Sequence, residues 1–487
     1  MTLPRRDFVE RALWLAAAAL ARRAPAAAPA TVSPARRPDG GPVRIAVVGT
    51  NNRGDKHVDG WLANPDAELV AVCDCDPACL TKYASRFATL PRQPAFEHDV
   101  RRLLDRQDID AVSIATPNHW HALMTIWAMQ AGKDVYVEKP CSYTLAEGRV
   151  MADWARKLGR ICQMGAQSRS NPGMRQAIAF LQGGAIGPVK VAHALCYKRR
   201  PSIGLVSTPA PLPPGIDFDL WAGPAPAEVP IRAKLHYDWH WDQRTGNGDL
   251  GNQNPHELDK ARWGLGKHDL PRRVVSLGGR LGYVDNGDVA NSQVTIFQWD
   301  DATLISDVRG LEIKTPVTYG LKVDPLRVAN IWWGTEGYVV APNYVSGVAF
   351  DYDGHELGAW SKGDDQHHYD NFIEAVKSRR REDLHLDIEE GHLSSALAHL
   401  GNVSWALGTP VEPGTRAALA ADEPHVRATW ESFEKHLGEQ QIDYAATQLR
   451  LGRELAIDPP TERTADEQAN ALFTREYRQG FELPVPS

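Results

Sequence analysis

The sequence predicts an α/β protein with an N-terminal Rossmann domain, built on a doubly wound parallel sheet. A C-terminal α+β domain with an open, mainly antiparallel sheet is expected to follow. The first observation is that short apolar runs alternate with helical segments between residues 43 and 165, as βαβ units require. The second is a later series of runs that alternate polar and apolar residues, typical of an antiparallel sheet with one wet face. These later runs cover residues 274–284, 291–299, 303–310, 326–333 and 337–341.

The composition is that of an ordinary folded protein. Its 487 residues are 43% hydrophobic and 24% charged, which excludes global disorder. With 54 Lys+Arg against 61 Asp+Glu, the formal net charge is −7, and no overall basic field favours nucleic acid. The six cysteines lack the paired spacing of zinc ligands, so we predict no metal site. We expect a Rossmann domain over residues 43–165, a substrate domain over 166–408 and a surface-wrapping tail over 409–487.

The first thirty residues differ from the rest of the chain. Arg5 and Arg6 precede an apolar run over residues 12–21, and an Ala/Pro stretch follows. This run is too short to span a bilayer, which needs about 20 residues. The pattern predicts a twin-arginine signal peptide over residues 1–30, a linker over 31–42, and export of a folded protein to the periplasm or beyond. The alternative is a disordered Ala/Arg/Pro tail.

A glycine-rich turn follows the first apolar run. Residues 49–54 read Gly-Thr-Asn-Asn-Arg-Gly, a Rossmann fingerprint with Asn at the second glycine position. Asp74 ends the second apolar run, 74 − 54 = 20 residues after the last glycine, where a ribose-binding acid is expected. Its carboxylate would repel a 2′-phosphate, so we predict NAD rather than NADP. The cofactor residues predicted here are Gly49, Asn51, Asn52, Arg53, Gly54 and Asp74. Two strands that merely end in a glycine turn and a capping Asp are the alternative.

Two later strand ends carry polar loops. Residues 116–121 follow the strand predicted over 109–115, and Glu138-Lys139-Pro140 follows the one over 134–137. Ligands of open α/β sheets bind at the carboxyl ends of strands, where these loops emerge. We therefore add to the cofactor residues Thr116, Pro117, Asn118, His121, Glu138 and Lys139. A turn lysine on the surface is the alternative for Lys139.

The densest group of functional residue types lies between residues 236 and 259. Asn254 followed by Pro255 predicts an N-cap and a helix start, which places His256 in the first turn. Helix amides disfavour an imidazolium there and leave a neutral imidazole. Asp259, three residues on, shares its helix face and is expected to orient the ring. The predicted substrate residues are Lys139, Tyr237, Trp239, His240, Asn252 and His256.

In their order and spacing, these motifs resemble the glucose–fructose oxidoreductase/inositol dehydrogenase/MocA (Gfo/Idh/MocA) family. The resemblance implies that Lys139 lies near nicotinamide and substrate, and that His256 and Asp259 form the family's H-x-x-D element. Many members carry an Asp four residues before that His, where this chain has Asn252, which can bind a hydroxyl but cannot act as a base. Asp249 therefore stays open as an alternative catalytic base.

Three functions are compatible with this sequence. The first is an NAD-dependent oxidoreductase that transfers hydride to or from a carbinol carbon of a sugar or cyclitol, with Lys139 and His256 handling the proton. The second is an NAD-dependent glycoside hydrolase that works by transient oxidation, elimination and water addition. The third is a non-catalytic sugar-binding protein. We expect a carbohydrate-type small molecule as substrate, a homo-oligomer, no nucleic-acid partner and no stable membrane anchor after processing.

Overall fold

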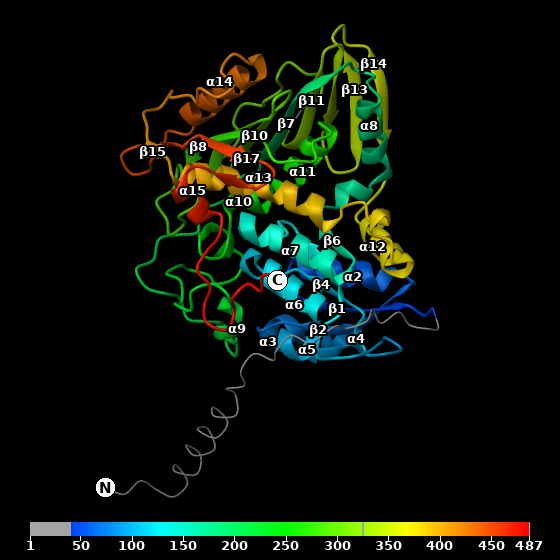
Figure 1. The fold of residues 1–487 in the computed structure, drawn as a ribbon. Coiled ribbons are helices and arrows are strands. Elements are labelled where there is room, and N and C mark those ends of the chain that lie inside the picture. The colour runs from blue at the N-terminus through cyan, green and yellow to red at the C-terminus, as the bar shows by residue number, and fades with distance from the viewer. Residues whose placement is uncertain (1–39, 324–325, 487) are drawn as a thin grey trace, which may run out of the picture.

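The computed structural model describes residues 40–323 and 326–486. The predicted signal peptide and nearly all of the predicted linker lie outside the described residues. A Rossmann domain occupies the lower half of Figure 1 and a large sheet domain the upper half, with the long helix α13 (Ile388–Ala406) between them. No helix in the described ranges combines the length and apolar character that crossing a bilayer requires.

The first domain contains the predicted doubly wound parallel sheet. Its strand order is β3-β2-β1-β4-β5-β6, so the direction of winding reverses between β1 and β4, where such folds bind ligands. The strands are β1 (Val43–Val48), β2 (Ala67–Cys73), β3 (Ala95–Glu97), β4 (Ala111–Ile114), β5 (Asp134–Glu138) and β6 (Cys162–Gly165). The helices between them are α2 (Arg53–Ala63), α3 (Pro77–Thr81), α4 (Ala84–Phe87), α5 (Val100–Leu104), α6 (Asn118–Gln130) and α7 (Leu145–Leu158).

Later parts of the chain complete this domain. Tyr369, on α12 (Gln366–Ser378), packs edge-on against Trp61 of α2 with ring centroids 4.8 Å apart. Near the C-terminal end, Phe481 lies against Trp120 of α6 with centroids 5.6 Å apart. The C-terminus accordingly lies beside α6 and α7 in Figure 1. The Rossmann core is therefore closed by segments that are far away in the sequence.

The second domain is a mixed, mainly antiparallel sheet in the order β14-β13-β12-β11-β7-β10-β9-β8-β16-β15, in which only β7 and β10 pair in parallel among the described strands. The predicted strand over 337–341 matches β12 residue for residue, whereas β13 and β14 were not predicted. The strands are β7 (Val189–Tyr197), β8 (Arg273–Gly279), β9 (Ser292–Gln298), β10 (Thr303–Arg309), β11 (Val328–Gly334), β12 (Gly337–Ala341), β13 (Ser346–Asp351), β14 (Glu356–Ser361), β15 (Thr409–Pro410), β16 (Arg450–Leu451), β17 (Leu455–Asp458) and β18 (Arg463–Thr464).

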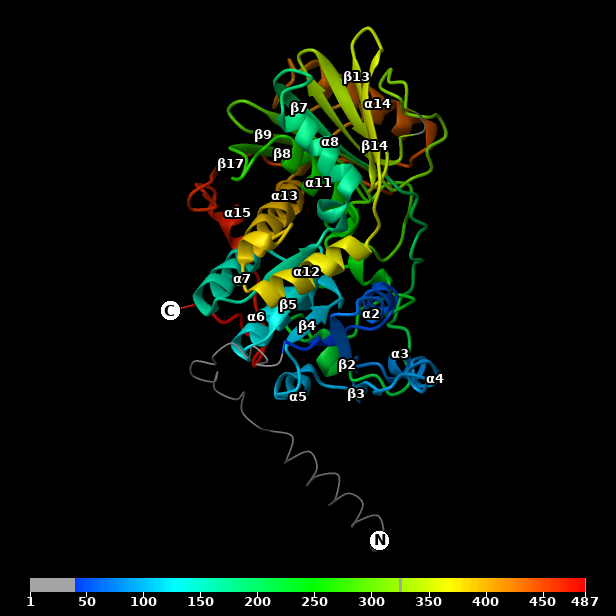
Figure 2. The same ribbon diagram turned by 90° about the vertical axis from the view of Figure 1, so that its right-hand side faces the viewer.

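The expectation of one wet face on this sheet is wrong. Every residue of β10 is buried, because helices cover both faces. Figure 2 shows α8 (Pro172–Gln182), α11 (Pro255–Gly264) and α13 on one side and α14 (Pro424–Glu439) on the other. Trp430 and Phe433 of α14 belong to the same buried cluster as Ile305 and Ile331 of the sheet.

The C-terminal segment does more than wrap the surface. Besides supplying α14, it adds β16 and β17, both of which pair with β8. The short helices α9 (Phe218–Ala222), α10 (Gly248–Asn252) and α15 (Glu467–Leu472) complete the chain together with the 3-10 turns η1 (Gln167–Ser170), η2 (Asp238–Trp241) and η3 (Arg381–Asp383). Much of this segment is thus an integral part of the second domain, whereas Phe481 near its end packs in the Rossmann core.

We expect Trp430→Ala to lower the free energy of unfolding by about 3–5 kcal/mol, because it empties a buried site under the sheet. The measurement is chemical denaturation of the purified protein. Lys435→Ala, at an exposed position of the same helix, is the control and should unfold like the parent. A Trp430→Ala protein as stable as the control would mean that α14 only rests on the surface.

Candidate active site

A cleft of about 500 Å³ is lined by residues of both domains. It brings together most of the residues that the sequence singles out, although they are spread over some two hundred positions. Those lining it are Gly49, Asn51, Asn52, Arg53, Asp74, Thr116, Pro117, Asn118, His121, Glu138, Lys139, Tyr237, Trp239, His240, Asn252 and His256. Gly54, Asp249 and Asp259 are not part of its lining.

The turn between β1 and α2 requires both of its glycines. Gly49 has φ +79°, and a Cβ there would lie 2.7 Å from the backbone nitrogen of Thr116. A Cβ on Gly54 would collide with the Gly49 carbonyl. The close fit leaves the N-terminus of α2 facing the cleft, where its free amides and positive dipole end suit a pyrophosphate. The residues present therefore fit a dinucleotide.

Asp74 is held rigidly at the end of β2. Its Oδ2 accepts hydrogen bonds from the backbone nitrogen and the hydroxyl of Thr50, at 2.8 and 3.0 Å. Its Oδ1 accepts from the backbone nitrogen of Asp76 at 3.0 Å. Burial raises the pKa of Asp74, while the Thr50 donors favour its charged form. A carboxylate fixed in this way can accept from a ribose hydroxyl and disfavours a phosphate at the same place.

Glu138 has a structural role, whereas its motif predicts that it binds the cofactor. Its Oε1 accepts from Arg53 at 2.8 Å, His57 at 3.1 Å and Gln167 at 3.0 Å. Burial alone would raise the pKa of Glu138, but Arg53 and His57 hold it well below its ordinary value. The carboxylate is therefore an anchor that fixes Arg53 at the cleft, rather than a group free for a ligand.

His121 and Asn118 tie the strand-end loops together. The two ring nitrogens of His121 lie 2.6 Å from the Pro140 carbonyl and 2.8 Å from the Thr116 carbonyl. Burial lowers the pKa of His121, so the neutral ring donates to one of these carbonyls at a time. The Asn118 amide donates to the Asn247 side chain at 2.9 Å and so links the two domains. Both residues position the cleft wall.

Lys139 and His256 both line the cleft at the junction of the domains. The Lys139 ammonium donates to the Asn252 carbonyl, across the cleft from its own strand. Burial lowers the pKa of Lys139 below its ordinary value, and burial together with Lys139 places the pKa of His256 well below 6.5. The imidazole is therefore neutral, and burial is the largest cause of its lowered pKa. Its ring lies 5.0 Å from the ring of Tyr344.

The helix that carries His256 begins at Pro255 as predicted, but its N-cap was predicted wrongly. Asn254 has helical backbone angles, φ −67° and ψ −14°, and its side chain makes no capping hydrogen bond. Instead its amide donates to the Ser306 hydroxyl at 2.5 Å. The short helix α10 ends only at Asn252, so the chain turns directly from one helix into the next and leaves no extended position for a cap.

Asp259 does not orient His256. Both of its oxygens accept from Arg169 at 2.8 Å, and Oδ1 also accepts from the Ser394 hydroxyl at 2.7 Å. Asp259 is fully buried and Arg169 nearly so. The shared helix face suggested a local partner, but the guanidinium of Arg169, ninety positions earlier in the chain, satisfies this carboxylate completely.

Asp249 is no better placed to act as a base. Its two oxygens accept from Arg200 at 2.7 and 2.9 Å, and the residue is fully buried behind the cleft wall. A third Arg200 donor reaches the Tyr237 hydroxyl at 2.6 Å. Both oxygens of this carboxylate are thus occupied by one guanidinium, and the cleft lining does not include Asp249. This geometry favours His256 over Asp249.

Cleft residues that were not predicted from the sequence include Lys198, Arg200 and Gln253. Lys198 and Arg200 belong to a basic run that directly follows β7. A strand that ends in consecutive basic residues was the available signal, since strand ends supply ligand-binding side chains. The Lys198 ammonium donates to the Gln253 side chain at 3.0 Å.

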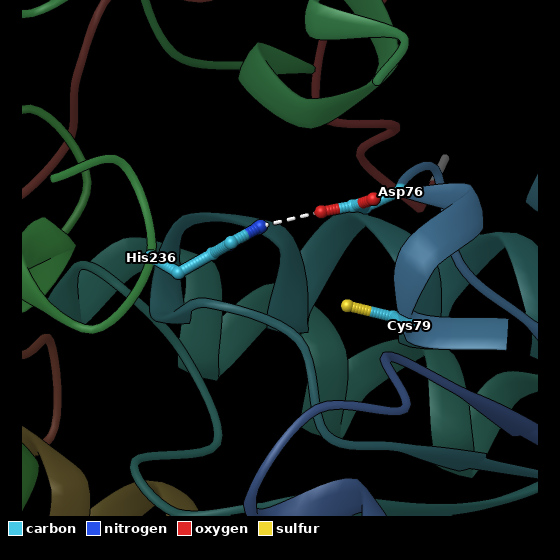
Figure 3. Close-up of side chains that lie close together, drawn as sticks. All are labelled: Asp76, Cys79 and His236. Carbon is cyan, nitrogen blue, oxygen red and sulfur yellow. Dashed lines mark hydrogen bonds and ion pairs between the residues drawn. The ribbon is translucent and has the colours of Figure 1, made fainter. Parts of the chain in front are cut away.

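A long loop between β7 and α10 covers the end of the cleft next to Asp74. Figure 3 shows His236, from this loop, pointing at Asp76, with the sulfur of Cys79 beside them; the His236 Nε2–Asp76 Oδ2 distance is 2.7 Å. These ligand atoms lie within 4.8 Å of one another, a set that could surround a metal ion. Burial raises the pKa of the Cys79 thiol to about 12, which disfavours the thiolate that would bind a metal. We therefore describe the contact as a polar latch between the loop and the Rossmann domain.

The geometry defines a two-domain Rossmann protein with a dinucleotide cleft at its switch point. Residues 43–166 match the model of the "Oxidoreductase family, NAD-binding Rossmann fold". The likeness to the Gfo/Idh/MocA oxidoreductase family therefore covers the Rossmann domain, where the predicted motifs lie.

Sequence relatives match part of the chain only. A glycosyl hydrolase family 109 protein of Shewanella pealeana is 33% identical over 181 residues, which cover 34% of this chain and 39% of the relative. Another protein of that name, from Shewanella sp., is 35% identical over 127 residues, covering 25% of this chain and 28% of the relative. The chain thus matches well under half the length of these curated relatives.

Solved structures share the fold over both domains. The WlbA dehydrogenase from Bordetella pertussis, crystallised with NADH and UDP-GlcNAcA, aligns with a TM-score of 0.54 and 20% identity, covering 73% of this chain and 94% of that one. An oxidoreductase domain protein from Kribbella flavida aligns with a TM-score of 0.56 and 19% identity, covering 74% and 96%. At these identities the likeness supports the architecture alone.

We expect Asp259→Asn to lower the free energy of unfolding by about 3–5 kcal/mol, because it leaves Arg169 buried without its counter-charge. Denaturant titration measures the loss. Asp301→Asn, which removes a carboxylate paired with Lys267 at the surface, is the control and should change little. Equal stability of the two variants would contradict a structural role for Asp259.

Proposed function

We propose that this protein is an NAD-dependent oxidoreductase that acts on a carbinol carbon of a sugar or cyclitol. One observation carries the proposal: a single cleft joins the glycine turn and Asp74 to Lys139 and His256. The first pair fits a dinucleotide, and the second pair can manage a proton. Because the relatives match only part of the chain, the activity of the whole protein is inferred from this geometry.

The cleft residues divide the proton chemistry between them. A bound nicotinamide supplies the hydride acceptor. Neutral His256 takes the hydroxyl proton as the C–H bond gives up its hydride and the carbon becomes a carbonyl. The Lys139 ammonium, already directed across the cleft to the Asn252 carbonyl, is placed to donate a hydrogen bond to the same oxygen. Reduction runs the same steps in reverse.

A redox-neutral glycoside hydrolase is the second candidate. Its support is the name of the partial relatives, glycosyl hydrolase family 109, and the latched loop over the Asp74 end of the cleft. In such a cycle the hydride returns to the sugar after elimination and water addition, so one retained cofactor serves many turnovers. Export of a folded protein, which residues 1–30 predict, would also remove it from the cellular NAD supply.

Two measurements separate these candidates. The first is mass analysis of the denatured native protein for released NAD. The second is a screen of sugars and aryl glycosides, with and without added NAD, that follows both NADH absorbance and aglycone release. Cleavage without added cofactor would favour the hydrolase, and NADH that accumulates with substrate would favour the oxidoreductase. Turnover with neither signal would contradict both.

We expect Lys139→Ala and His256→Ala each to lose turnover by about 10²–10⁴-fold, as is typical for acid–base groups. Both variants should still bind NAD, because neither side chain forms the glycine turn or the Asp74 site. His268→Ala, at an exposed histidine, is the control. Full activity of the His256→Ala protein would overturn the assignment.

We expect kcat/KM to decline on the acidic side only at a pH well below 6.5. His256 acts as a base only when neutral, and its pKa is well below 6.5. We expect kcat/KM to stay level as the pH falls through 6.5 and to decline only further down, where the imidazole gains a proton. A pH series of kcat/KM measures this, and a half-loss at 6.5 or above would contradict the buried, neutral imidazole.

The latch should slow cofactor exchange. We expect His236→Ala to release NAD faster than the parent, because the loop loses its contact with Asp76. His236→Gln is the matched control, since its amide can still donate to the carboxylate. Stopped-flow displacement of bound NADH by excess NAD gives both rates. An unchanged rate in the alanine variant would show that the loop does not limit release.

A further inference from the structure

The cleft is locally cationic, although the whole chain carries a formal charge of −7. Besides Arg53, which is paired with Glu138, its lining includes the cationic side chains of Lys139, Lys198 and Arg200. Among the described residues, the carboxylates in that lining are Asp74 and Glu138. Asp74 is held by Thr50 at the end of β2, and Glu138 is tied to Arg53, so neither compensates the cations that come from the second domain.

These three cations differ in the groups that already pair with them. Both arms of the Arg200 guanidinium are occupied by Asp249, which lies behind the wall. Lys139 donates to a backbone carbonyl and has its role beside His256. Lys198 is exposed, and its contact is the neutral Gln253 side chain, which accepts one of the three ammonium donors.

The histidines near these residues add no positive charge. Burial lowers the pKa of His240 to about 4 and places that of His256 well below 6.5, so both rings are neutral at neutral pH. The excess positive charge on the second-domain side of the cleft is therefore centred on Lys198. A ligand that covers Lys198 removes water from an ammonium, which is costly unless the ligand brings an anion.

We infer that the substrate is an anionic carbohydrate whose charged group binds at Lys198, an inference that rests on the proposed function. The fork of Arg200 is occupied, so the site offers a point charge and not the planar, two-donor face that selects carboxylates. A uronic-acid carboxylate and a sugar sulfate ester share the chemistry that this site recognises. Gln253 accepts from Lys198 and donates to the Tyr344 hydroxyl, so it holds the ammonium at the cleft.

The test compares matched ligands on the NAD-loaded protein. The probes are glucuronate, glucose 6-sulfate and glucose, together with galacturonate, galactose 6-sulfate and galactose. Binding is followed by tryptophan fluorescence, since Trp120, Trp221 and Trp239 line the cleft. In at least one series we expect an anionic member to bind about tenfold more tightly than its neutral partner, the effect of one charge-assisted contact. If the uronate binds more tightly, the charged group is a carboxylate; if the 6-sulfate does, it is a sulfate ester.

Two variants locate the effect. Lys198→Gln should abolish the preference, while Arg199→Gln, at the exposed neighbour outside the cleft lining, should retain it. Neutral sugars that bind as tightly as anionic ones, no binding by any anionic probe, or equal loss in both variants would overturn the inference. Because binding is read without turnover, a preference that persists without NADH formation would count against the oxidoreductase function alone.

Discussion

The buried ion pair between Arg169 and Asp259 is the contact on which the geometry of the cleft depends. Arg169 lies in η1, directly after the last Rossmann strand, and Asp259 lies on α11 of the second domain. Ser394 of α13 donates to the same carboxylate, so three elements meet at one buried charge. A buried carboxylate is tolerated only when it is fully paired, and sliding α11 by one turn would separate it from Arg169. The pair thus fixes the register of the helix whose first turn presents His256 to Lys139.

Other polar contacts repeat this coupling along the cleft. Asn118 reaches Asn247 from α6, Lys139 reaches the Asn252 carbonyl from the end of β5, and His236 reaches Asp76 from the long loop. In each case a Rossmann residue is bonded to a residue more than a hundred positions later. The cofactor and substrate parts of the cleft are therefore one structure, and a shift of either domain would disturb both. The same contacts explain why the Rossmann motif alone does not define the chemistry.

Local sequence patterns were sufficient to predict the Rossmann domain, its ligand-binding loops and the start of the helix that carries His256. The glycine turn, Asp74 and the strand-end loops were found because each follows a short buried strand, and parallel strands read as continuous apolar runs. The start of α11 was found from Pro255, whose ring suits the first helical turn. The strands β13 and β14 were missed because Gly, Ser and acidic residues interrupt their apolar residues. The buried second face of the large sheet was missed because α14, which covers it, is far away in the chain. Lys198 and Arg200 were missed although they follow a strand, because no motif marks them.

The sequence by itself determined the fold class, the dinucleotide turn and the identity of Lys139 and His256 as residues worth testing. Periodicity and spacing were sufficient to predict these features, because strands, turns and helix starts depend on neighbouring residues. Only the tertiary structure decided the partners of the carboxylates. Spacing places Asp259 on the face of His256 and Asp249 near it, yet the carboxylates are taken by Arg169 and Arg200, ninety and forty-nine positions away. A buried charge binds whichever opposite charge the packed interior brings closest, and that neighbour is set by how distant segments pack.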